Sequence, residues 1–116
     1  MIIFVGKLNY SPYASDELFS VVFRDNVQLG DSVTVIHQWS KDASGKSKAN
    51  SAHHGTVNKV TLVDTAEKDI EIFSDEKDLT YYWYKGKVLG EKLTLSMFNK
   101  GGEEVAKNIQ LQIAFF

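Results

Sequence analysis

The chain has 116 residues, a formal net charge of −2, 43% hydrophobic residues and no cysteine. This length fits a single domain, expected over residues 1–116, with a core large enough to fold without disulfides or bound metal ions. The slightly negative charge argues against a nucleic-acid partner bound through bulk positive charge, and the lack of cysteine excludes disulfides, thiolate metal sites and cysteine catalysis.

The first residues lack the basic segment and long apolar segment of a signal peptide. No apolar run approaches the roughly 18 residues that a membrane-spanning helix needs. We therefore expect a soluble protein with no membrane span, which is either cytoplasmic or exported by a non-classical route.

Apolar and polar residues alternate with a period of two along most of the chain, which indicates β-strands. Such a pattern is typical of a sandwich or a small barrel, and we expect an antiparallel two-sheet β-sandwich of the immunoglobulin-like kind, with seven or eight strands. A short helix over 12–18 is an alternative for that segment, because Ser15 and Asp16 are common helix caps. The predicted strands are 2–8, 18–23, 33–39, 57–63, 70–73, 79–84, 92–98 and 109–116.

Three short segments read as turns or strand ends: residues 28–31, residues 85–87 after the sixth strand, and Gly101 with Gly102 in a hairpin. Alternation within the strands then selects the core. The predicted core residues are Phe4, Leu18, Val22, Val33, Val35, Val60, Leu62, Ile72, Leu93, Leu95, Ile109, Leu111 and Ile113.

Residues 41–55 form the longest stretch without an apolar side chain larger than alanine. Long loops of this kind are either plain flexible connections or binding loops. The adjacent His53 and His54 would point in opposite directions in an extended backbone, so a metal site would also need His37 or Asp42. We expect no metal and no cofactor.

Catalytic signatures are absent from the sequence. No serine lies in a Gly-x-Ser-x-Gly elbow, and the acidic pairs at 16–17, 75–76 and 103–104 fall in expected turns. General acid–base chemistry needs carboxylates in a partly buried cleft. We therefore expect that the protein is not an enzyme.

The run Tyr81-Tyr82-Trp83-Tyr84 is the most informative motif. Alternation places Tyr81 and Trp83 on one face of a strand, and Tyr82 and Tyr84 on the other. One face must belong to the core, so the other is an exposed or covered aromatic surface suited to sugar rings or protein interfaces. Alternatively, the tyrosines merely flank the core with their hydroxyls in water.

Two fragments resemble the fungal immunomodulatory proteins, which are small lectin-like β-sandwich proteins. The first joins residues 9–12 to a strand ending at 21–23, and the second joins residues 98–101 to Ala106 and to residues 109–110. The resemblance implies an immunoglobulin-like sandwich, binding to cell-surface sugars and a homodimer. The sequence departs from that family because it lacks most of the N-terminal helix through which those proteins dimerise.

The leading hypothesis is a non-enzymatic, lectin-like binding module whose partner is a glycan or another cell-surface ligand. Trp39, Tyr82 and Tyr84 are the expected stacking residues. One alternative is a structural subunit of a homodimer, higher homo-oligomer or particle, and another is a membrane-active β-sandwich. The expected hydrogen-bonding residues are Asp42, Asn50, His53 and His54.

Overall fold

The computed structural model of the chain describes residues 1–10, 14–25, 27–37, 51–63, 67–74 and 82–115. These residues form eight β-strands, and none of them lies in a helix. The strands are β1 (Ile2–Tyr10), β2 (Ala14–Phe23), β3 (Ser32–His37), β4 (Ser51–Val63), β5 (Glu67–Ser74), β6 (Tyr82–Leu89), β7 (Lys92–Asn99) and β8 (Glu104–Phe115).

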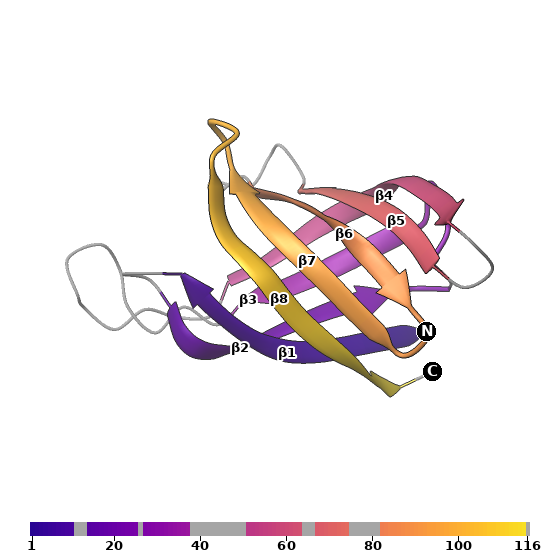
Figure 1. Ribbon diagram of the computed structural model, residues 1–116, viewed down its shortest axis with the longest axis horizontal. Coiled ribbons are helices and arrows are strands. Elements are labelled where there is room, and N and C mark those ends of the chain that lie inside the picture. The colour runs from indigo at the N-terminus through magenta and orange to yellow at the C-terminus, as the bar shows by residue number, and fades with distance from the viewer. Residues whose placement is uncertain (11–13, 26, 38–50, 64–66, 75–81, 116) are drawn as a thin grey trace.

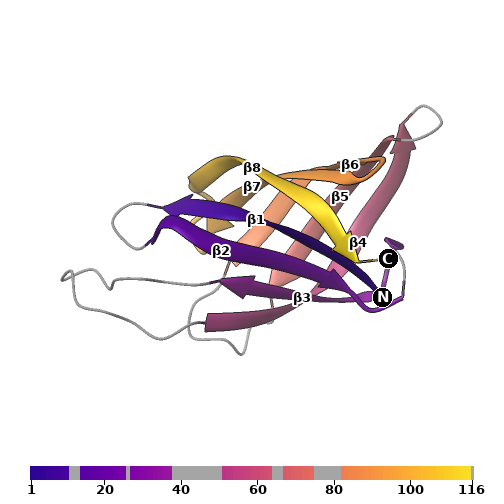
Figure 2. The same ribbon diagram turned by 90° about the horizontal axis from the view of Figure 1, so that it is seen from below.

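Each strand pairs antiparallel with the next, and β1 also pairs with β8, so the sheet closes into a barrel (Figure 1). Figure 2 shows β1 lying between β2 and β8. The expectation of an antiparallel all-β fold is confirmed, whereas the expectation of two packed sheets is not confirmed, because the described strands form one closed sheet. Apolar and polar residues alternate in the same way along the strands of a sandwich and of a barrel, so the pattern does not distinguish the two. The structure is a barrel because the first strand pairs with the last, which removes the free edges that a sandwich would keep.

Residues 14–18 are strand rather than helix, and residues 12–13 of the alternative helix lie outside the described residues. Asp16 lies in β2 with a φ of 51°, a left-handed conformation that does not continue a right-handed helix. The Asp16 backbone N–H donates to Asn9 Oδ1 at 2.9 Å, and Asn9 Nδ2 donates to Asp16 Oδ1 at 3.3 Å. These two hydrogen bonds tie β1 to β2 beside the register shift between Leu8 and Tyr10.

Several other strand boundaries differ from the predictions; β8, for example, begins at Glu104 rather than at residue 109. β4 begins at Ser51, so residues 51–55 are strand and not part of a loop. β6 runs through residues 85–87 to Leu89, although Gly86 was expected to help end it. A Cβ at Gly86 would overlap the carbonyl oxygen of Thr94, so glycine marks a close approach between β6 and β7 inside the sheet.

The predicted turns at 28–31 and 101–102 are confirmed. The Asp31 N–H donates to the Gln28 carbonyl at 3.0 Å. In the β7–β8 turn, the Gly102 N–H donates to the Asn99 carbonyl at 3.0 Å, and Gly102 has a φ of 83°. Glycine adopts this left-handed conformation without a steric penalty.

Large side chains fill the barrel, as expected for an eight-stranded barrel whose interior is just wide enough to be packed. Their rings meet edge to face, with centroid separations of 6.0 Å for Phe4 and Phe23 and 5.9 Å for Phe19 and Tyr84. The predicted core residues Phe4, Val33, Val35, Ile72, Leu93, Leu95, Ile109 and Leu111 are buried, Val60 and Ile113 are partly buried, and the side chain of Leu62 lies outside the described residues.

The predicted core face of β2 is wrong. Leu18 is 41% exposed and Val22 is only partly buried, whereas Phe19, Val21 and Phe23 are fully buried. Both faces of residues 18–23 carry apolar side chains, so alternation alone does not decide between them. The face that carries Leu18 and Val22 points outward, because the other face carries two phenylalanines and buries more apolar surface.

Candidate functional site

The two tyrosines expected to form a stacking surface lie inside the barrel. Tyr84 is 0% exposed and Tyr82 is 8% exposed. The Tyr82 ring packs edge to face on Tyr10, with centroids 6.2 Å apart. The alternation of β6 is confirmed, but its core face is the tyrosine face, so the prediction that Tyr82 and Tyr84 are exposed stacking residues is wrong.

Of the other predicted binding residues, the structure describes only the backbones of His53 and His54. Trp39, Asp42 and Asn50 lie outside the described residues. The backbones of His53 and His54 belong to β4, opposite Val35 and Thr34 of β3, and their side chains lie outside the described part.

Trp83 lies on the outer face of β6, in register with an aromatic residue on each neighbouring strand. Phe73 of β5 is directly opposite it on one side, and Phe98 of β7 is directly opposite on the other. The Trp83 ring centroid lies 5.4 Å from that of Phe73, at an interplanar angle of 81°, and 6.2 Å from that of Phe98, at 56°. All three side chains are partly exposed. We call Phe73, Trp83 and Phe98 the outer aromatic row.

Four charged side chains continue this face along the strands, and we call them the charged ladder: Asp69, Glu71, Lys85 and Lys87. Lys85 Nζ lies 4.0 Å from Glu71 Oε1, and Lys87 Nζ lies 3.8 Å from Asp69 Oδ1. These four residues, with Ile70 and Gly86, line a shallow hollow of about 300 Å³.

The aromatic row and the charged ladder are joined by Lys85. Its Nζ lies 5.6 Å from the centroid of the Phe98 ring, which is within the range of a cation–π contact. Side chains of Lys85 and Lys87 are 52% and 55% exposed. Exposed ion pairs of this kind contribute little to stability, so these groups can exchange partners with a ligand at little cost to the fold.

Alternation could have revealed the outer aromatic row before the structure was known. Phe73 has the opposite parity to the core residue Ile72, and Phe98 the opposite parity to Leu93 and Leu95. What alternation does not show is that the three rings fall in one row, because that depends on the registers of two separate strand pairs.

Among the described residues, no group of three or more metal-binding side chains lies close enough to hold an ion. None of these residues forms a helix that could cross a membrane. Comparisons of the chain with protein-family models, with curated proteins and with solved structures find no significant match. The resemblance to the fungal immunomodulatory proteins therefore stays a prediction.

Proposed function

We propose that the protein is a non-enzymatic carbohydrate-binding protein whose stacking platform is the outer aromatic row. The observation that supports this proposal is the position of Trp83. It is partly exposed, it faces away from the core, and Phe73 and Phe98 hold its ring from both sides. A large aromatic ring held in place loses little conformational entropy when a ligand stacks on it.

The charged ladder supplies the polar half of such a site. Sugar hydroxyls both donate and accept hydrogen bonds; carboxylates accept them and ammonium groups donate them. Successive outward residues of a strand are roughly 7 Å apart, so Glu71 and Lys85 lie within reach of the hydroxyls of a ring stacked on Trp83. Hydrogen bonds to charged groups are among the stronger ones available.

The same charges favour binding over catalysis. Asp69 and Glu71 are each paired with a lysine and partly exposed on the outer face of the barrel. Carboxylates that act as general acids or bases are held in partly buried clefts that shift their proton affinities. The proposed role for these two carboxylates is to accept hydrogen bonds from the ligand.

A glycan-array screen of the purified protein, with and without added divalent metal, tests the proposal. We expect reproducible binding to a related set of sugars. A blank array from a sample that is folded by circular dichroism would contradict a carbohydrate ligand.

The variant Trp83→Ala is expected to weaken binding to the best array sugar by about tenfold or more, because central aromatic residues dominate such sites. Isothermal titration calorimetry measures the loss. Leu18→Ala is the matched control, since Leu18 is an exposed apolar residue on β2, and it should leave the affinity unchanged. Equal affinity of Trp83→Ala and the unmodified protein would remove the row from the site.

Two other roles proposed for exposed aromatics have distinct outcomes. If the row is a contact between copies, light scattering should give a mass that rises with concentration, and Trp83→Ala should abolish the rise. If it inserts into lipid, the protein should co-sediment with liposomes and Trp83→Ala should not. Either result, together with a blank array, would replace the carbohydrate proposal.

A further inference from the structure

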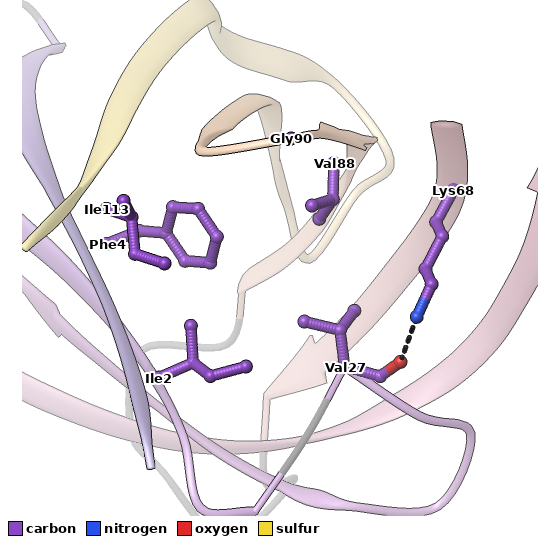
Figure 3. Close-up of a pocket in the computed structure, with 7 residues that line it drawn as sticks. All are labelled: Ile2, Phe4, Val27, Lys68, Val88, Gly90 and Ile113. Atoms are coloured by element: carbon purple, nitrogen blue, oxygen red, sulfur yellow. Dashed lines mark hydrogen bonds between the residues drawn. The ribbon is translucent and has the colours of Figure 1, made fainter. Parts of the chain in front are cut away.

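A second hollow lies at the end of the barrel where β1 begins and β8 ends (Figure 3). Its residues Lys68 and Val88 pair at the opposite end of the β5–β6 ladder from Phe73 and Trp83. It has a volume of about 230 Å³ and brings together residues from β1, β5, β6, β8 and the turns beside them. The lining residues are Ile2, Phe4, Val27, Lys68, Val88, Gly90 and Ile113.

Lys68 is the one charged residue of this lining, and it occupies an inward position. It pairs directly with Val88 of β6, which is 8% exposed, and it has the same parity as the buried Ile70. Lysine is rarely placed on an interior face unless its ammonium group has a partner. Lys68 is partly exposed, so its inward side chain lies at the mouth of the barrel rather than deep in the core.

The ammonium group of Lys68 retains hydrogen-bonding capacity. It donates to the Val27 carbonyl oxygen at 3.2 Å (Figure 3), and an ammonium group carries three donors. Within the described part of the chain, no carboxylate lies within ion-pair distance of its Nζ. A single anionic group entering the hollow would meet an available positive charge.

The rest of the lining is apolar. In Figure 3 the side chains of Ile2, Phe4, Val88 and Ile113 face the same open space as Lys68. A cavity of about 150 Å³ accommodates benzene, so about 230 Å³ corresponds to a ligand of roughly eight to ten non-hydrogen atoms. The combination of one cation with an apolar wall matches a small monocarboxylate that carries a hydrocarbon tail.

We propose that this hollow, the barrel-end pocket, binds a small apolar monocarboxylate, with the carboxylate on Lys68 and the hydrocarbon against Phe4, Val88 and Ile113. The inference is independent of the carbohydrate proposal, because the two sites share no residue. A doubly charged phosphate fits less well, since one ammonium group would leave half of its charge unpaired in an apolar setting.

Hexanoate is a suitable probe, with benzoate to compare a linear with an aromatic tail. Titration followed by amide chemical shifts in two-dimensional NMR should move Ile2, Val27, Lys68, Val88 and Gly90 in a saturable manner, with a dissociation constant of roughly 0.05–1 mM for a ligand of this size. Hexan-1-ol, which has the same tail and no charge, should bind at least about tenfold more weakly.

Lys68→Met is expected to weaken hexanoate binding by about tenfold to a hundredfold while leaving hexan-1-ol binding unchanged. Lys7→Met, which removes an exposed lysine of β1, should change neither. Val88→Phe fills the hollow and should abolish binding of both probes even if Lys68→Met unfolds the protein.

Three results would overturn the inference. They are an absence of saturable shifts at the pocket, equal affinity for hexanoate and hexan-1-ol, and unchanged hexanoate affinity in a folded Lys68→Met variant. Failure of the glycan array would not affect any of them, so the two proposals can fail separately.

Discussion

Replacing Tyr84 with alanine is expected to lower the free energy of unfolding by about 3–5 kcal/mol, the range typical of removing a buried aromatic side chain. Tyr84 is 0% exposed and is among the largest fully buried side chains. Its ring packs edge to face on Phe19 of β2, across the barrel interior, with centroids 5.9 Å apart. The neighbouring strands are hydrogen-bonded to one another round the closed sheet, so they cannot collapse freely into the space left behind.

Urea denaturation followed by circular dichroism measures this loss. Tyr84→Phe keeps the ring that packs on Phe19 and is expected to cost less than about 1.5 kcal/mol, because it changes the packed volume little. Trp83→Ala is the sharper comparison, because Trp83 is the adjacent residue but faces outward. If Trp83→Ala destabilised the protein as much as Tyr84→Ala, the inward face of β6 would have been assigned wrongly.

Replacing Gly86 with alanine is expected to destabilise the protein by about 2–3 kcal/mol, the upper part of the usual range for overpacking. An added Cβ would overlap the Thr94 carbonyl oxygen, and it would lie 2.8 Å from the Thr94 carbonyl carbon and 2.9 Å from Leu95 Cδ2. The first two atoms belong to the backbone of β7 and cannot rotate away. Relief therefore requires a shift of one strand against the other.

Gly101→Ala is the matched control for this prediction. A Cβ at Gly101 has Asn99 Oδ1 as its nearest neighbour, at an ordinary contact distance of 3.5 Å. We expect a change in unfolding free energy of less than about 1 kcal/mol. Equal urea midpoints for the two variants would mean that β6 and β7 do not approach as closely as the structure has them.

The substitutions Tyr84→Ala and Gly86→Ala also make it possible to distinguish effects on the fold from effects on the proposed binding surface. Both Tyr84 and Gly86 lie on β6 beside Trp83 and Lys85, so β6 carries core and candidate site on opposite faces. A variant that loses sugar binding without a change in urea midpoint acts through the outer face. A variant that loses both acts through the core.

Much of the secondary structure followed from the sequence alone. Alternation predicted strands that overlap all eight strands formed by the described residues. It also divided the aromatic run of β6 correctly into the pair Tyr82 and Tyr84 and the opposed Trp83. Glycine placed the β7–β8 turn, because the positive φ of Gly102 is a local requirement. These features depend on residues close together in the chain, and a single sequence records them directly.

The outward face of β2 and β6, the single closed sheet and the outer aromatic row were decided only by tertiary structure. A period of two defines two faces of a strand without saying which is buried when both are apolar. Closure depends on the pairing of Ile3 with Phe115, at opposite ends of the chain, and the aromatic row depends on the registers of β5 with β6 and of β6 with β7. Such long-range pairings depend on the total apolar surface that the closed barrel buries. A local sequence pattern does not record this quantity.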